Sequence, residues 1–196
     1  MNVELLTSRQ SLIDMEGFAV RAAQTCYGNE GKAVNYQEFL QRIINRKHES
    51  ILEHIYLTYR IQGLSRACLQ QLARHRHITL SVESTRHTLR KQIDTMPISA
   101  ENGYYSYLEK FNQAFREFAD EHPDMPNDEL KYYLPEFWPV KLFMTANVRA
   151  LRWILNLRTA PQALKEFRTL ARKLFEAVPD EFKYLLADCV HEEAKL

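Results

Sequence analysis

The side chains best suited to chemistry lie in one stretch, residues 74–86, where arginine, histidine and hydroxyl groups recur at a fixed spacing. The stretch opens with Arg-His-Arg at residues 74–76 and reaches Ser84 after seven intervening residues. Cations crowded in this way are costly unless an anion compensates their charge. Because guanidinium groups bind phosphate oxygens two at a time, the stretch predicts a site for a nucleotide or flavin phosphate.

Other kinds of site are weaker interpretations. A metal ion is not expected, because His48 and His54 lie at i and i+6, about 240° apart on a helix, whereas zinc-binding helices use i and i+4. Ser84 has no acid or base at a spacing that would activate it, so we expect it to position a ligand rather than attack one. His75 or His77 could act as a general base, but His75 stands between arginines, which should depress its pKa and suit it to orienting a ligand.

Length, charge and cysteine content limit the class of protein. At 196 residues the chain suits one domain spanning residues 1–196. Its net charge of +1 gives no general reason to expect a nucleic acid or a membrane as partner. Cys26, Cys68 and Cys189 form no Cys-x-x-Cys pair, and neither a signal peptide nor a membrane-spanning apolar run is recognisable. We therefore expect a cytoplasmic protein with small-molecule ligands.

The elements that must position these side chains follow from the periodicity of the apolar residues. Residues 55–61 alternate apolar and polar side chains, which predicts a half-buried strand ended by Gly63. A second strand is expected at residues 3–6, and helices are expected at residues 18–26, 36–45, 64–76, 105–121, 140–157 and 161–178, with a last one from Asp180. This order predicts an α+β fold, with a small antiparallel sheet packed against several helices.

Two of the expected helices carry candidate site residues. The helix over residues 64–76 would place Arg-His-Arg at its C-terminus, where the helix dipole favours cations. The helical pattern over residues 140–157 would align Asn147 with Arg158 along one face, about 16 Å apart. Such a face could contact both ends of an extended ligand.

Four blocks of the sequence together resemble the flavin-dependent, X-type thymidylate synthases. They are His-Glu-Ser-Ile-Leu-Glu-His at residues 48–54, Arg-His-Arg-x7-Ser at 74–84, Lys-Tyr-Tyr-Leu-Pro at 131–135, and Asn-x-Arg-x-Leu with Leu-Asn-Leu-Arg at 147–158. The resemblance implies reductive methylation of dUMP to dTMP, with methylenetetrahydrofolate as one-carbon donor, FAD as the flavin and NADPH as the reductant. It also implies a homotetramer whose sites lie at subunit interfaces.

The resemblance also implies roles for individual residues. The residues implied to bind FAD are Ser50, Arg74, His75, Arg76, Asn147, Arg149 and Trp153. Those implied to bind dUMP are Gln71, Arg74, Glu83, Ser84, Thr85, Arg86, Lys131 and Arg158. Arg158 is also the implied catalytic residue, facing the pyrimidine and stabilising the negative charge that develops on it. An arginine suits this role because it stays protonated and supplies paired donors.

The sequence departs from the family pattern mainly around the cofactor. Ser81 and Val82 stand in place of asparagine and glutamate, Trp153 replaces an asparagine, and Gln162 replaces a histidine. One alternative is therefore a diverged flavin-dependent methyl- or hydroxymethyltransferase that acts on another pyrimidine nucleotide. A further alternative, a basic nucleic-acid-binding module, is disfavoured because residues 67–91 lack aromatic side chains for base stacking.

Overall fold

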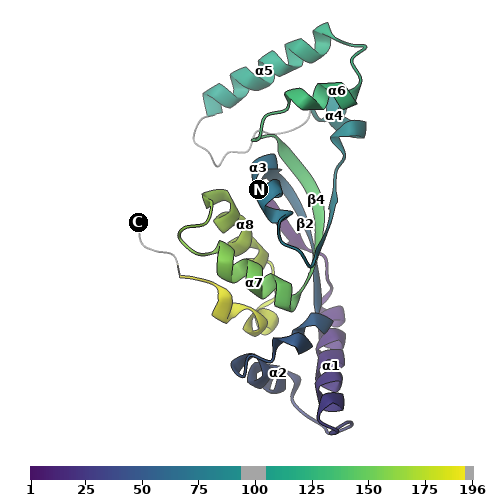
Figure 1. Ribbon diagram of the computed structural model, residues 1–196, viewed down its shortest axis with the longest axis vertical. Coiled ribbons are helices and arrows are strands. Elements are labelled where there is room, and N and C mark those ends of the chain that lie inside the picture. Colours follow the sequence, from purple (N-terminus) through teal and green to yellow (C-terminus); the bar gives the residue numbers. More distant parts are fainter. Residues whose placement is uncertain (94–104, 193–196) are drawn as a thin grey trace. The chain divides into compact units, whose positions relative to one another are not determined.

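The computed structural model describes residues 1–93 and 105–192, and the strands in these ranges form one four-stranded antiparallel sheet with the order β1-β2-β4-β3 (Figure 1). The strands are β1 (Asn2–Leu5), β2 (Tyr56–Ser65), β3 (Ile78–Val82) and β4 (Pro139–Asn147). Along β2, the buried Leu57, Tyr59 and Ile61 alternate with more exposed residues, as expected for a sheet covered on one face. The predicted α+β class and the antiparallel sheet are therefore confirmed.

Helices make up the other regular elements. The α-helices are α1 (Arg9–Cys26), α2 (Tyr36–Asn45), α3 (Arg66–Leu72), α4 (Thr85–Ile93), α5 (Tyr105–Glu121), α6 (Asn127–Leu130), α7 (Val148–Arg158) and α8 (Lys165–Glu176). The 3-10 helices are η1 (Glu49–His54), η3 (Lys131–Tyr133), η4 (Asp180–Leu185) and η5 (Ala187–Cys189). The predictions for residues 36–45 and 105–121 match α2 and α5 at both ends.

The chain groups into two compact units. The first unit comprises Met1–Asn2, Ile61–Arg74 and Ser81–Leu142, and the second comprises Val3–Arg60, His75–Leu80 and Phe143–Leu196. Strands β2 and β4 each run from one unit into the other, so each unit contains part of the sheet. A single domain over residues 1–196 stays a prediction.

The first unit has a hydrophobic core of its own. Its buried members are Leu89, Ile93, Phe115, Ala119, Leu130 and Trp138. Trp138 donates its indole N–H to Gln92 Oε1 at 3.1 Å, which satisfies the ring nitrogen inside the core. Arg90 donates to the backbone carbonyls of Ala119, His122 and Met125 at 3.1, 2.8 and 2.9 Å. Because the last carbonyls of a helix have no partner within it, Arg90 fastens the end of α5 to α4.

The largest error of prediction concerns residues 140–157, which were expected to form one helix. Strand β4 occupies Pro139–Asn147, and α7 begins only at Val148. Alternate residues of β4 are buried, including Leu142, Met144 and Ala146, which is the period of a strand. A short, mostly apolar run does not distinguish a strand from a buried helix, so the two elements were merged. Asn147 marks the change, since its side chain accepts a hydrogen bond from the Ala150 N–H at 2.8 Å and caps α7.

The helix expected over residues 64–76 is also shorter than predicted. Strand β2 continues to Ser65, whose hydroxyl caps α3 by accepting a hydrogen bond from the Cys68 N–H at 3.1 Å. The helix then ends at Leu72. Strand β3 and helix α4, which follow it, were not predicted, and α1 begins at Arg9 rather than at residue 18.

Gly63 lies inside β2 instead of ending it. Its φ of 78° is in the left-handed region, which residues with a Cβ atom rarely adopt. A Cβ atom at this position would lie 3.5 Å from Met1 Cα, an ordinary contact. Backbone strain, and not collision, is therefore what restricts residue 63.

Gly63→Ala is expected to lower the free energy of unfolding by about 1–2 kcal/mol, because alanine is strained in this conformation. Gly63→Asn is the matched control. It should lower the free energy of unfolding by less than Gly63→Ala does, since asparagine tolerates the left-handed region better than alanine. Urea unfolding followed by circular dichroism would measure both changes. An alanine variant as stable as the wild type would show that the strand relaxes around residue 63 without cost.

Candidate functional site

The Arg-His-Arg segment lies in the turn after α3 and not on the helix. Ala73 caps α3, and His77 has a left-handed φ of 62°, so the chain turns between α3 and β3. The expectation that these residues end a helix is therefore wrong. Arg74 and Arg76 are exposed, whereas His75 is only 8% exposed. The turn thus directs two guanidinium groups outward and one imidazole inward.

His75 holds Arg158 in the second unit. Arg158 donates from Nε to His75 Nε2 at 2.9 Å, and its guanidinium carbon lies 4.5 Å from the centre of the Phe167 ring. His75 meets the same ring edge-on, with 5.7 Å between ring centroids. Because an imidazolium has no acceptor, this hydrogen bond requires a neutral His75 with its proton on Nδ1. Phe167 is therefore a common platform for the imidazole and the guanidinium.

The acidity of His75 agrees with this arrangement. Burial, followed by the positive charge of Arg158, lowers the pKa of His75 to about 4. The depressed pKa expected from the sequence is found, although burial is its main cause. At neutral pH, His75 is a hydrogen-bond acceptor for Arg158 and is too weak a base for efficient proton transfer.

The start of α7 is joined directly to η1. Arg149 Nη1 pairs with Glu53 Oε1 at 2.5 Å, and the Val148 N–H donates to the Ile55 carbonyl at 2.8 Å. Ser50 is exposed on η1, and Trp153 is 64% exposed on α7, one turn beyond Arg149. An exposed indole and a neighbouring guanidinium offer an aromatic face and paired donors, which suit the ring and the pyrophosphate of a flavin nucleotide.

Two cations of the first unit converge on one carboxylate. Arg86 Nε lies 2.7 Å from Asp128 Oδ2, and Lys131 Nζ lies 2.9 Å from Asp128 Oδ1. The hydrogen bond from Lys131, with a further contribution from the charge of Arg86, lowers the pKa of Asp128. Arg86 and Lys131, which were both predicted to bind dUMP, therefore lie close together in the fold. Both contact Asp128, a residue that the prediction did not include.

Glu83 follows β3 and has an unusual environment. Its N–H donates to the Lys141 carbonyl at 2.9 Å, which fixes the backbone beside β4. Its Oε2 atom is buried and accepts no hydrogen bond from the described residues, and the nearest cation, Lys141 Nζ, is 3.9 Å away. The adjacent Ser84 accepts hydrogen bonds at its carbonyl from the N–H groups of His87 and Thr88, both at 3.1 Å, and so begins α4. Burial of Oε2 without a hydrogen-bond donor is unfavourable, so Glu83 is an unusual carboxylate among the described residues.

The predicted site residues divide between the two units. The first unit contains Gln71, Arg74, Glu83, Ser84, Thr85, Arg86 and Lys131. The second contains Ser50, His75, Arg76, Asn147, Arg149, Trp153 and Arg158. Apart from Arg74 and Arg158, the first unit carries the residues assigned to dUMP and the second carries those assigned to FAD.

Three residues that organise these groups were missed. Asp128 stands three positions before Lys131, a spacing at which opposite charges meet on a helix, so a signal was present. Phe167 and Arg152 carried no comparable signal, because their partners are remote in the sequence. Arg152 is buried and paired with Glu49 and Asp188.

Neither of the histidines considered for a metal site belongs to a metal cluster. His48 Nδ1 lies 3.4 Å from the Tyr27 hydroxyl. Across residues 1–93 and 105–192, no group of three or more histidine, cysteine, aspartate or glutamate side chains could hold a metal ion. In the same ranges, none of the helices is both long enough and apolar enough to cross a membrane.

Replacing His75 is expected to change how stability depends on pH. Between the ordinary pKa of 6.5 and the folded value of about 4, the unfolded chain binds a proton at His75 and the folded chain does not. The neutral imidazole therefore contributes stability that is complete above pH 6.5 and is lost as the pH falls toward 4. His75→Gln keeps an acceptor for Arg158 but does not titrate, so the wild type should lose more stability than this variant over that range.

Urea unfolding at several pH values would test this expectation. The control is His77→Gln, a change at an exposed histidine that should behave like the wild type. If the free energy of unfolding falls equally in His75→Gln and in the wild type as the pH is lowered, folding does not hinder protonation of His75, and the expectation is wrong.

Comparison with known proteins identifies the family. Residues 10–182 match the family described as thymidylate synthase complementing protein, Thy1. The flavin-dependent thymidylate synthase of Helicobacter pylori is 35% identical over 211 aligned residues, which cover 96% of this chain and 99% of that protein. The enzyme of the same name from Wolinella succinogenes is 36% identical over 195 residues, with 88% and 92% covered.

Solved structures agree with the sequence comparisons. A crystal structure of Thymidylate Synthase X from Helicobacter pylori, with FAD and dUMP, matches with a TM-score of 0.77 and 31% identity, covering 98% of this chain and 100% of that one. A UMP/dUMP methylase from Streptomyces cacaoi shares the fold, with a TM-score of 0.68 and 18% identity over 90% of this chain and 88% of that one. The match over residues 10–182 and the relatives above 30% identity show that this chain belongs to the thymidylate synthase complementing protein family, to which the sequence resemblance had pointed.

Proposed function

We propose that this protein is a flavin-dependent thymidylate synthase that converts dUMP to dTMP. The observation that carries the proposal is the convergence of Arg86 and Lys131, held 2.7 and 2.9 Å from a common anion. Two cations that meet in this way are suited to binding a phosphate. Relatives named for the same activity cover nearly the whole chain, which supports the assignment.

The dUMP phosphate binds at Arg86 and Lys131 in this proposal, close to Asp128. The other residues proposed for dUMP are Gln71, Arg74, Glu83, Ser84, Thr85 and Arg158. Glu83 would accept a hydrogen bond from the nucleotide through its partly exposed carboxylate. Lys131 stands where the family has arginine, so it supplies charge without the two-pronged geometry of a guanidinium.

Arg158 stabilises negative charge on the pyrimidine in this proposal. Its partner at Nε is a neutral imidazole, which orients the guanidinium and brings no negative charge of its own to that position. A carboxylate in the same place would offset the charge that the reaction needs. His75 therefore acts as a positioning residue for Arg158.

FAD is held by Ser50, Arg74, His75, Arg76, Asn147, Arg149 and Trp153 in this proposal. When bound, it supplies the hydride after reduction by NADPH, while methylenetetrahydrofolate supplies the one-carbon unit. Arg76 and Arg149 are exposed cations that suit the pyrophosphate. The Asn147 amide oxygen caps α7, so its NH₂ group is the part suited to donate to a ligand.

A related enzyme acting on another pyrimidine nucleotide is the second candidate. Val82 and Trp153 favour it, because both are exposed apolar side chains at positions where the family has glutamate and asparagine. Incubation with dUMP or dCMP and the mass of the product would distinguish the two candidates.

We also propose a cytoplasmic homotetramer with sites shared between chains, and with neither nucleic acid nor membrane as partner. Cys26, Cys68 and Cys189 are free thiols, which suits a reducing compartment. Light scattering of the purified protein would test the assembly.

The absorbance spectrum of the protein after incubation with FAD and desalting tests the proposed cofactor. We expect a retained oxidised-flavin spectrum and formation of dTMP when dUMP, methylenetetrahydrofolate and NADPH are added. Bound flavin without dTMP would favour the second candidate. A protein that retains no flavin would contradict both.

Arg158→Ala is expected to lower the turnover number by about 100-fold or more, while flavin content changes little, because the charge acts at the pyrimidine. Arg60→Ala is the matched control, since Arg60 is an exposed arginine of the same unit, 4.0 Å from Glu4. Steady-state kinetics and flavin absorbance would be measured on both. Wild-type turnover in Arg158→Ala would remove Arg158 from the mechanism.

A further inference from the structure

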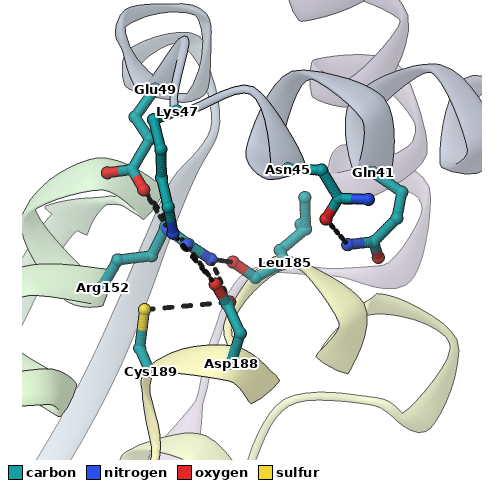
Figure 2. Close-up of polar contacts among 8 residues, drawn as sticks. All are labelled: Gln41, Asn45, Lys47, Glu49, Arg152, Leu185, Asp188 and Cys189. Atoms are coloured by element: carbon teal, nitrogen blue, oxygen red, sulfur yellow. Dashed lines mark hydrogen bonds and ion pairs between the residues drawn. The ribbon is translucent and has the colours of Figure 1, made fainter.

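Arg152 is the most deeply buried charged side chain among the described residues, with 2% of its surface exposed. It projects from α7 toward η1 and the C-terminal turns, as Figure 2 shows. Nε and Nη2 donate to Glu49 Oε1 at 3.2 and 3.1 Å, and Nη1 and Nη2 donate to Asp188 Oδ1 and Oδ2 at 2.6 and 2.8 Å. Nη1 also donates to the Leu185 carbonyl at 2.7 Å. Every nitrogen of the guanidinium therefore donates to a partner.

Arg152 and Asp188 favour each other's charged forms. Burial by itself would lower the pKa of Arg152, but the hydrogen bond to Asp188 and the charges of the neighbouring acidic groups, Glu49 among them, together outweigh it and raise that pKa. The same hydrogen bond lowers the pKa of Asp188. Lys47 Nζ, 3.9 Å from Asp188 Oδ2, adds a second cation beside this carboxylate. The Arg152 guanidinium has a defined position, because it is buried and each of its nitrogens donates to an acceptor.

The two carboxylates contact the guanidinium differently. Asp188 binds it with both oxygens, which sets the plane of the guanidinium. Glu49 accepts through Oε1 alone. Both carboxylates bind the same guanidinium. The orientation that Asp188 gives to it therefore also sets where Glu49, the first residue of η1, can accept its hydrogen bonds.

Helix η1 is held both by the burial of Leu52 and by ion pairs to α7. It is a 3-10 helix of six residues without a side-chain cap at its start, and short helices of this kind are weak on their own. Helix α7 holds it at two places, through Arg152 and Glu49 and, one turn earlier on α7, through Arg149 and Glu53. Ser50 lies between the two attachments.

We propose that the Arg152–Glu49 pair is a positioning device for the flavin site, keeping Ser50 in place relative to Arg149 and Trp153 on α7. The inference rests on the proposed function, because it takes FAD as the ligand of these residues. Loss of Glu49 leaves Arg152 paired with Asp188, so the fold is retained while the start of η1 is released.

Flavin titration of the full-length apoprotein tests the proposal. Glu49→Ala should raise the Kd for FAD by about tenfold or more, the scale found when a residue that orients a ligand-binding group is removed. Glu181→Ala is the matched control: it also removes a glutamate paired with an arginine, Arg9, at 2.7 Å in the same unit, and should leave the Kd unchanged. Glu49→Gln keeps an acceptor oxygen for Arg152 and should restore most of the affinity.

A double-mutant cycle separates positioning from a general loss of stability. If Glu49 acts through Ser50, Ser50→Ala raises the Kd in the wild type but adds little to Glu49→Ala. Additive effects, or an unchanged Kd in Glu49→Ala, would overturn the positioning role while the proposed function stands. A wild-type protein that binds no FAD would instead overturn the proposed function, and the positioning role with it.

Discussion

The burial of the Arg152 guanidinium constrains much of the second unit. A charge removed from water is tolerated only when its donors meet matching acceptors, and here they come from Glu49, Asp188 and the Leu185 carbonyl. These three residues belong to η1 and to the turns near the C-terminus, whereas Arg152 belongs to α7. The pairing therefore joins α7 to segments that are distant in the sequence, in addition to the packing of its buried apolar residues.

Helix α7 carries candidate ligand-binding groups at both ends, and each end is fixed by different chemistry. Near its start, Asn147 caps the helix by accepting a hydrogen bond from the Ala150 N–H, and the ion pair of Arg149 with Glu53 attaches the helix to η1. At its end, Arg158 meets the neutral His75 and the ring of Phe167. The two arginines differ in these partners: the buried charge of Arg152 lies beside two carboxylates, whereas the partner of Arg158 at Nε is a neutral imidazole.

In the first unit, the paired cations are exposed or partly exposed, whereas Arg152 in the second unit is buried. Arg86 and Lys131 both contact Asp128, and their side chains remain partly exposed. Exposed ion pairs of this kind contribute little to stability, so they can rearrange at small cost when a stronger anion binds. In the proposed function, a nucleotide phosphate would share these cations with Asp128, so this carboxylate would compete with the phosphate for them.

Local patterns in the sequence determined α2 and α5 at both ends, the alternation of β2 and the family. These features depend on neighbours in the chain, since periodicity and motif spacing act over a few residues. Tertiary structure decided the rest. The strand at residues 139–147 was hidden because a short apolar run is ambiguous until its partner strand is known. The contact of His75 with Arg158 and the burial of Arg152 join groups 83 and 103 residues from their partners, and only packing brings such charges together.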